Sequence, residues 1–158
     1  MSRARAGGDG EIMTERFTWD TANDVHARSL ARLESEQIIW ITTIGRNGFP
    51  HAVPVWFLWH DGAVVIFSEP ATAKVKNLRE NEHALAHLEA GDDHEQLTVL
   101  QGVARISERS ASEWLAEIGD RYGAKYEHGL AELKLTAETM SEKYSSVIVL
   151  EPTHLIAW

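Results

Sequence analysis

Apolar and polar residues alternate along residues 38–68 in three blocks that predict β-strands. The blocks are Ile38–Arg46, Phe49–His60 and Ala63–Ser68. They are separated by Asn47-Gly48 and Asp61-Gly62, dipeptides that readily adopt the positive φ angles of a two-residue type I′ hairpin turn. Because each turn reverses the chain within two residues, the three strands are expected to form an antiparallel meander.

Helical spacing of apolar residues predicts helices on both sides of this meander. The helix that follows it is expected over about Ala71–Glu80, with Ser68 as the candidate N-cap and Pro70 in the first turn. Further helices are predicted over Asp24–Glu36, with Asn23 or Asp24 as the cap, and over Ser110–Tyr122, with Ser110 as the cap and Gly123 as the stop. Further strands are predicted over His83–Leu88, Leu97–Ile106 and Tyr144–Leu150, before a short apolar segment His154–Trp158. Residues 124–139 are ambiguous. About six strands, three helices and no βαβ alternation predict a mainly β fold, a six-stranded antiparallel barrel with appended helices.

Length and composition indicate a single domain. The chain has 158 residues, 44% of them hydrophobic, enough to bury a core without disulfides. Residues 1–20 lack periodicity and are expected to form a flexible tail, which leaves residues 21–158 as the domain. The absence of cysteine excludes thiolate metal sites and favours a cytoplasmic protein. A net charge of −9 argues against nucleic-acid binding, and no apolar run approaches the roughly 20 residues of a membrane span.

The densest group of basic residues lies on the helix predicted after the meander. Lys74 and Asn77 are three residues apart and share one face of that helix, and Lys76 and Arg79 flank them. Together with Ser68 and a helix N-terminus, these side chains could clamp a phosphate. Surface helices also carry lysines for solubility, and spacing alone favours that explanation. The location of the cluster at a helix start, in an acidic chain, favours a phosphate site.

Both faces of the middle predicted strand carry large apolar side chains. Alternation places Val53, Val55, Phe57 and Trp59 on one face and Pro54, Trp56 and Leu58 on the other. Such a strand either packs into a core on both sides or faces a ligand or a partner subunit on one side. The pattern favours the two explanations equally. Because Pro54 has no N–H for a sheet ladder, it is expected at an edge or a bulge.

Sequence motifs for metal-dependent or nucleophilic catalysis are missing. His83 and His87 have the spacing of a helical zinc pair, but Ala84 stands where the metalloprotease motif has glutamate. The sequence contains neither a Gly-x-Ser-x-Gly elbow nor a Walker loop. No side chain is therefore identified as a nucleophile or a base.

Several short motifs occur between residues 38 and 106. They are Trp40-Ile41-Thr42-Thr43, Asn47-Gly48-Phe49-Pro50, Pro54-Val55-Trp56-Phe57, Ser68, Lys74, Asn77-Leu78 and Gln101-Gly102-Val103-Ala104. As a set, these motifs resemble the pyridoxamine 5′-phosphate oxidase-like family of FMN-binding split β-barrels. Within that family the chain is most similar to the actinobacterial branch assigned to the deazaflavin coenzyme F420.

The resemblance implies a homodimer of split β-barrels with the cofactor in a groove at the subunit interface. In the family, the lysine matching Lys74, with neighbours matching Lys76 and Asn77, binds the cofactor phosphate, and Ser68 matches a further position of the site. The strand matching Val55, Trp56, Phe57 and Leu58 lies along the ring system. A dimer is also favoured by the number of large aromatic side chains on strands of one small barrel, Trp40 and Trp158 among them.

The resemblance implies an oxidoreductase that transfers a hydride between reduced coenzyme F420 and a flat, apolar or conjugated small molecule. An FMN-dependent oxidoreductase on the same scaffold is an alternative, as is a protein that binds a flavin, haem or tetrapyrrole without turnover. The pyridoxal-binding residues of the oxidase that names the family are not found, which argues against vitamin B6 chemistry. A cofactor that brings its own hydride chemistry would explain why no catalytic side chain stands out.

Overall fold

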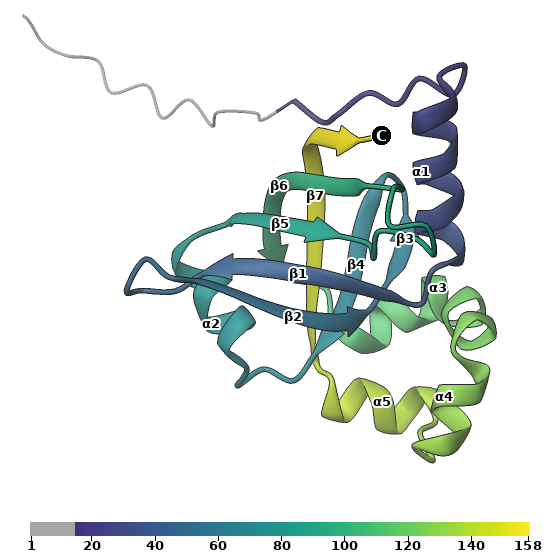
Figure 1. Cartoon of the computed structure of the whole chain (residues 1–158). Helices are drawn as coiled ribbons and strands as arrows, with labels where there is room; N and C mark the ends of the chain where they lie inside the picture. Colours follow the sequence, from purple (N-terminus) through teal and green to yellow (C-terminus); the bar gives the residue numbers. More distant parts are fainter. Residues whose placement is uncertain (1–14) are drawn as a thin grey trace, which may run out of the picture.

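The computed structural model describes residues 15–158, which form one curled antiparallel sheet with helices around it (Figure 1). The strands are β1 (Ile38–Ile44), β2 (Pro50–Trp56), β3 (Leu58–His60), β4 (Ala63–Ser68), β5 (His83–His87), β6 (Thr98–Ile106) and β7 (Ser146–Ala157). The helices are α1 (Asp24–Ser35), α2 (Ala73–Glu80), α3 (Ala111–Lys125), α4 (Glu127–Glu132) and α5 (Ala137–Lys143). The sheet order is β2-β1-β5-β6-β7-β4-β3, and the curled sheet makes a half-barrel. Within residues 15–158, no helix is long and apolar enough to cross a membrane.

The described part of the chain has seven strands, so the expected number of six was wrong. The segment Phe49–His60, predicted as one strand, is broken at Phe57 into β2, which pairs with β1, and β3, which pairs with β4. The Tyr126 hydroxyl accepts a hydrogen bond from the Phe57 N–H at 2.8 Å and donates to the Phe57 carbonyl at 2.7 Å. Because these backbone groups are occupied, Phe57 does not continue the ladder. Two consecutive strands therefore lie at opposite ends of the sheet order.

Strand β7 is longer than predicted. It runs through Pro152 and joins the segments that were expected separately over 144–150 and 154–158. Beside Pro152, the pairing of β6 with β7 shifts register between Gln101 and Gly102, which leaves Thr153 of β7 without a partner in the ladder. A proline offers no N–H to the ladder, and this β-bulge accommodates it. The other two strand prolines, Pro50 and Pro54, lie on the edge strand β2, and an edge position was predicted for Pro54.

The two hairpin turns occur where the sequence predicts them, but only one has the predicted type. Asp61 and Gly62 have φ angles of 49° and 72°, as a type I′ turn requires. In the other turn Gly48 alone is left-handed, with φ 82°, and the Gly45 N–H donates to the Phe49 carbonyl at 2.9 Å. The type I′ prediction was therefore wrong there, because a loop longer than two residues needs only one left-handed position.

Helix α2 begins later than predicted. Its N-cap position is Thr72, so Ser68 is not the cap and Pro70 does not lie in the first turn. Ser68 stays in β4, where it pairs with Ser146 of β7, and its hydroxyl donates to the Glu69 carbonyl. The strand therefore retains Ser68, and the chain needs residues 69–72 to turn before the helix can start.

The predicted caps do begin α1 and α3. The Asn23 side chain accepts two N–H groups of the first turn of α1, and Ser110 forms a capping box with Glu113 in α3. Gly123 does not end α3, which continues to Lys125. A helix-ending glycine adopts a positive φ, and Gly123 does not. The ambiguous segment 124–139 contains the end of α3, all of α4 and the start of α5.

Two hydrophobic clusters lie on the two sides of the curled sheet. The inner cluster fills the half-barrel and includes Leu33 of α1, Leu78 of α2, Ile41, Phe57, Trp59, Leu100 and Leu150. The outer cluster lies between β3, β4 and β7 and the helices α3 to α5, and it includes Leu58, Val65, Trp114, Ile118, Met140 and Val147. Phe57 and Trp59 thus face inward and Leu58 outward, which confirms the predicted alternation.

The residues before α1 lie against the barrel. The Phe17 N–H donates to the carbonyl of Pro152 at 2.8 Å, and Trp19 packs edge-on against Trp59 with ring centroids 5.7 Å apart. Trp19 also contacts the inner cluster. Residues 1–14, the larger part of the predicted tail, lie outside the described residues.

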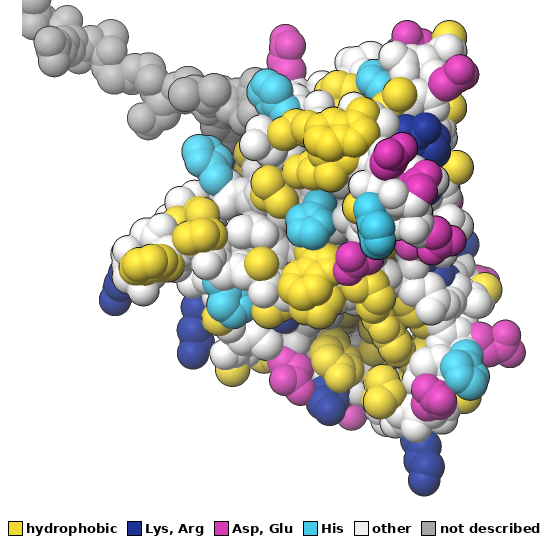
Figure 2. Space-filling view, in the orientation of Figure 1, with side chains coloured by type: hydrophobic (Ala, Val, Ile, Leu, Met, Phe, Trp, Pro, Cys, Tyr) yellow, Lys and Arg dark blue, Asp and Glu magenta, His cyan; other side chains and the backbone are white. Residues whose placement is uncertain are grey.

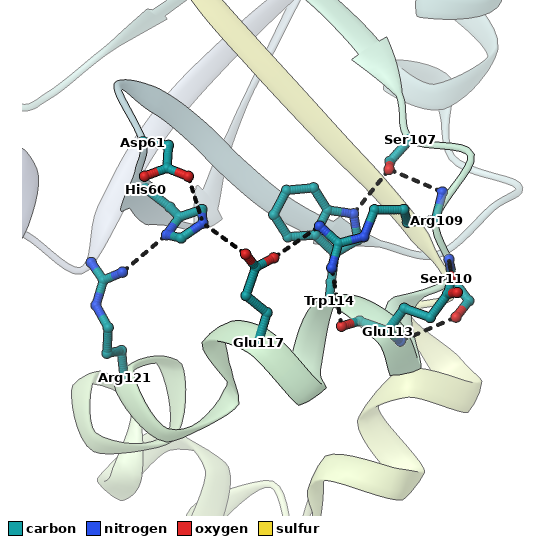
Figure 3. A network of polar contacts seen from close by, with 9 residues as sticks. All are labelled: His60, Asp61, Ser107, Arg109, Ser110, Glu113, Trp114, Glu117 and Arg121. Carbon is teal, nitrogen blue, oxygen red and sulfur yellow. Dashed lines mark hydrogen bonds and ion pairs between the residues drawn. The ribbon is translucent and has the colours of Figure 1, made fainter.

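A polar network attaches α3 to the end of β3 (Figure 3). Arg121 donates to Nδ1 of His60 at 3.0 Å, and a Glu117 oxygen lies 3.8 Å from Nε2 of the same ring. Glu117 also pairs with Arg109 at 2.8 Å, and the Arg109 guanidinium lies 4.4 Å from the ring centroid of Trp114. Ion pairs that are partly exposed add little stability one by one. Together, these contacts fix the face that α3 presents to the sheet.

Candidate functional site

A pocket of about 340 Å³ lies where β2, β4, the start of α2 and the helices α3 and α5 meet. One end is polar and is lined by Ser68, Glu69, Thr72 and Lys74. The other end is apolar and is lined mainly by Trp56, Phe67, Tyr122, Leu135, Met140 and Tyr144. A concave site with a few polar groups at one end and aromatic walls elsewhere is typical of a small-molecule or cofactor site.

Lys74 is the only cation among the described residues that line this pocket. Its side chain is half-buried, and burial lowers its pKa below the ordinary lysine value, an effect that nearby Glu69 opposes. Glu69 itself lies 3.8 Å from the ammonium of Lys143 on α5. Within residues 15–158, no carboxylate lies within ion-pair distance of Lys74. An anion bound here would offset the free-energy cost of burying the charged ammonium of Lys74.

Trp56 forms one wall of the pocket and is held between two elements of the helical region. Its ring stacks on Tyr126 with centroids 4.6 Å apart and an interplanar angle of 10°. On α4, a Cβ atom at Gly129 would lie 2.6 Å from the Trp56 ring. Only glycine allows this approach, so the α3–α4 junction fixes the orientation of the tryptophan.

The strand break beside Trp56 is held by the end of α3. The Tyr126 hydroxyl bonds to both backbone groups of Phe57 and lies 2.7 Å from the Gln37 carbonyl. Lys125 Nζ donates to the Phe57 carbonyl at 3.0 Å and lies 3.8 Å from the centroid of the Phe57 ring. Burial lowers the pKa of Lys125 to about 8. The end of α3 thus positions the backbone that carries one wall of the pocket.

Four of the predicted site residues, Val55, Trp56, Ser68 and Lys74, line the pocket. The other four do not. Phe57 and Leu58 are 0% and 4% exposed and belong to the inner and outer clusters. The Asn77 amide donates to the Thr43 hydroxyl at 3.0 Å beside a separate hollow at the β1–β2 hairpin, and Lys76 is exposed.

The contribution of α3 to α5 to this pocket was not predicted from the sequence. Tyr122, Leu135, Met140 and Tyr144 line it, and all lie near or within the segment that was ambiguous. A usable signal was present, because aromatic and aliphatic residues recur every four positions from Trp114 through Ile118 and Tyr122 to Tyr126. Such a row lies on one face of a helix and predicts that this face packs on the sheet.

The histidines of the described chain are not grouped into a metal site. His83 and His87 lie on β5, a strand, so they do not have the geometry of a helical zinc pair. Among residues 15–158, no group of three or more His, Asp or Glu side chains is arranged to hold a metal ion.

The chain thus combines an antiparallel half-barrel with a pocket that is lined by both polar and aromatic side chains. Residues 25–158 match the family model of pyridoxamine 5′-phosphate oxidase, and the chain belongs to this family. No curated protein is significantly similar to the chain.

Three solved structures illustrate the shared fold. A conserved hypothetical protein, Rv2991 from Mycobacterium tuberculosis, is 23% identical, with 84% of this chain and 82% of that chain covered and a TM-score of 0.69. An F420 reductase is 18% identical, with 80% and 94% covered and a TM-score of 0.62. HutZ, the haem storage protein from Vibrio cholerae, is 14% identical, with 82% and 92% covered and a TM-score of 0.63. At these identities the likeness concerns the fold.

Proposed function

We propose that this chain is an oxidoreductase that binds a flavin-type cofactor, preferentially coenzyme F420, and transfers a hydride between it and a flat, apolar or conjugated small molecule. The observation that carries the proposal is Lys74, a half-buried cation without an ion-pair partner in residues 15–158, at the polar end of a pocket with aromatic walls. This set of groups fits a ligand with a phosphate at one end and a planar ring at the other. Membership in the pyridoxamine 5′-phosphate oxidase family supports it.

Each residue of the pocket has a role in this proposal. Lys74 binds the phosphate, and Val55 and Trp56 lie along the ring, with Trp56 held in place by Tyr126. Apolar side chains of α5 and the preceding loop, Met140 and Leu135, exclude water from the ring. The bound cofactor supplies the hydride chemistry, so the protein contributes binding and orientation.

The preference for coenzyme F420 over FMN rests on charge. Beyond the phosphate, coenzyme F420 continues into an acidic oligoglutamate tail, which FMN lacks. Lys76 and Arg79 are exposed on α2, the helix that carries Lys74, and are the candidates to bind this tail. Isothermal titration with both cofactors at low and high salt tests this. Tighter binding of coenzyme F420 with a steeper salt dependence is expected, whereas equal affinities and equal salt dependence favour the FMN-dependent enzyme.

Replacing Lys74 by alanine is expected to weaken binding of both cofactors by about 1.5–3 kcal/mol, because a charge-assisted hydrogen bond to the phosphate is lost. This is a roughly 10- to 150-fold rise in Kd. Unfolding in urea should be little changed, since the ammonium has no ion-pair partner among the described residues. Lys76→Ala is the matched control and should weaken only coenzyme F420 at low salt. A Lys74→Ala variant with wild-type affinity for both cofactors would show that Lys74 is a surface lysine without a ligand.

A carrier that binds a planar cofactor without turnover is the second candidate. It is favoured by the stacked pair of Trp40 and His87 on the exposed face of the sheet, with an interplanar angle of 3°, because an imidazole beside an aromatic ring suits a haem or tetrapyrrole. Adding haemin to the same titrations separates the candidates. Haemin binding that is lost in His87→Ala, combined with no turnover of either flavin-type cofactor, would favour the carrier.

We also propose that the chain forms a homodimer through the exposed face of β1, β5, β6 and β7. One row across these strands consists of Trp40, His87, Val99 and Ile156, which are successive partners in the ladder. Ile156 and the neighbouring Trp158 are 43% and 60% exposed. Figure 2 shows hydrophobic side chains with histidines between them over this face. A patch of this kind on a single subunit is typical of an interaction site.

Ile156→Asp is expected to shift the protein to monomer, because dimer formation would desolvate an unpaired carboxylate within the patch. Sedimentation velocity at micromolar concentration measures this. Ala116→Asp, on the exposed side of α3, is the control and should remain dimeric. A wild-type protein that sediments as a monomer, or an Ile156→Asp variant that stays dimeric, would contradict the proposed interface.

A further inference from the structure

Tyr122 is a buried phenol whose hydroxyl has no partner within the described protein. The residue is 2% exposed and packs between Phe67, edge-on at 5.1 Å, and Tyr126, tilted at 4.8 Å. No hydrogen bond links its hydroxyl to any other group in residues 15–158. By contrast, the hydroxyl of Tyr126, one helical turn later, is bonded to three backbone groups.

The small exposed part of Tyr122 opens into the pocket. Among the described residues, a single side-chain polar atom, Nδ1 of His51, is both fully inaccessible to solvent and without a hydrogen-bond partner. The Tyr122 hydroxyl also has no partner but does not meet this description. It is therefore accessible to solvent. Tyr122 lines the pocket at its apolar end, on the side formed by α3. A buried polar group generally has a hydrogen-bond partner, so this hydroxyl is free to bond to water or to a ligand group that enters the pocket.

The hydroxyl is available as a donor over a wide pH range. Burial, with smaller contributions from Tyr126 and Tyr144, raises the pKa of Tyr122 well above its ordinary value. The phenol therefore stays protonated and donates its hydrogen. Among residues 15–158, the charged groups that line the pocket are Glu69 and Lys74, both at the polar end. A ligand group beside Tyr122 thus has to be a neutral acceptor, because a carboxylate there would be buried without a counter-charge.

We propose that the Tyr122 hydroxyl binds a neutral carbonyl oxygen of a planar, conjugated ligand in this pocket. A neutral carbonyl on a conjugated ring can be part of the cofactor or of the acceptor molecule, and the Tyr122 hydroxyl would bind either in the same way. Trp56 and Phe67 cover the flat faces of the ligand, and Tyr122 fixes its orientation by one directional bond. The inference rests on the proposed function for the identity of the cofactor, but it concerns a residue that the phosphate site does not involve.

The test compares wild type with Tyr122→Phe, which removes only the oxygen. Because the hydroxyl has no partner in the described protein, thermal stability should not fall, and the near-ultraviolet circular dichroism should be retained. The ligands are coenzyme F420, FMN, and the matched pair menadione and 2-methylnaphthalene, which differ in their carbonyl oxygens. Dissociation constants are measured by isothermal titration without turnover. Ser112→Ala is the control: it removes an exposed hydroxyl from the same helix at a residue that does not line the pocket, so every dissociation constant should stay unchanged.

We expect Tyr122→Phe to weaken the carbonyl-bearing ligand about tenfold and to leave 2-methylnaphthalene unchanged. A selective loss with coenzyme F420 and FMN assigns the bond to the cofactor ring, and a selective loss with menadione assigns it to the acceptor. Equal affinities of wild type and Tyr122→Phe for every ligand would overturn the inference, and so would a fall in melting temperature of several degrees. If neither cofactor binds the wild type, the proposed function fails, while the menadione pair still decides the role of Tyr122.

Discussion

Replacing Gly102 by alanine is expected to destabilise the protein by about 3 kcal/mol or more. A Cβ atom at this position would lie 2.1 Å from the carbonyl oxygen of Glu151 and 3.0 Å from the Cα atom of Pro152. Both neighbours are backbone atoms of β7 and cannot move aside as the end of a side chain can. The strands would have to separate at the bulge that accommodates Pro152.

Urea unfolding followed by tryptophan fluorescence measures this effect. The matched control is Gly123→Ala, because Gly123 lies within α3 and a Cβ there would meet no atom within 4 Å. That change should stabilise the protein by about 0.5–1 kcal/mol, the usual difference between glycine and alanine in a helix. Opposite signs for the two variants are therefore expected. A Gly102→Ala variant as stable as wild type would show that β6 and β7 do not approach each other as the structure describes.

The second large effect is expected for Tyr126→Phe, which should cost about 2–3 kcal/mol of stability. The substitution keeps the ring that stacks on Trp56 but removes the hydroxyl that bonds to the Phe57 N–H and to the carbonyls of Phe57 and Gln37. Lys125 still donates to the Phe57 carbonyl, so the Phe57 N–H is the group left buried without a partner. An unsatisfied buried donor costs about 1–3 kcal/mol in addition to the lost bonds.

Tyr122→Phe supplies the control for this prediction on the same face of α3. Both substitutions remove one phenolic oxygen from a buried ring, but only the Tyr126 oxygen has partners in the described protein. Amide hydrogen exchange at Phe57 and Leu58 should become faster in Tyr126→Phe and stay unchanged in Tyr122→Phe. Equal stabilities of the two variants would mean that the strand break does not depend on the tyrosine hydroxyl.

The sequence predicted those parts of the fold that depend on local chemistry. Asp61-Gly62 specifies its own turn, Asn23 and Ser110 supply caps, and alternation assigns Phe57 and Leu58 to opposite faces. The break at Phe57 was not predictable in this way. It depends on a tyrosine hydroxyl 69 residues later in the chain, and periodicity carries no information about such a contact.

The candidate site was also predictable only where it depends on local sequence. The residue types at Lys74 and Trp56 suggested a ligand, and both line the pocket. The apolar end of the pocket depends on how short helices fold back on the sheet, and α4 and α5, of six and seven residues, have too few turns for a clear periodic signal. Asn77, which shares a helix face with Lys74, bonds to Thr43 because α2 also packs on β1. Spacing along one helix cannot tell these two environments apart.

The order of the strands also constrains how the chain folds while it is being synthesised. Strand β4 consists of six consecutive buried residues, and its neighbours in the sheet are β3 and β7. Strand β3, which forms a hairpin with β4, emerges from the ribosome just before β4. Residues 146–150 of β7, which pair with the other edge of β4, emerge only after α3, α4 and α5. Until then an apolar strand edge has no partner, the kind of surface that chaperones bind. Closing the half-barrel is therefore a late, long-range step of folding, made when the newest part of the chain inserts between two strands, β6 and β4, that are already complete.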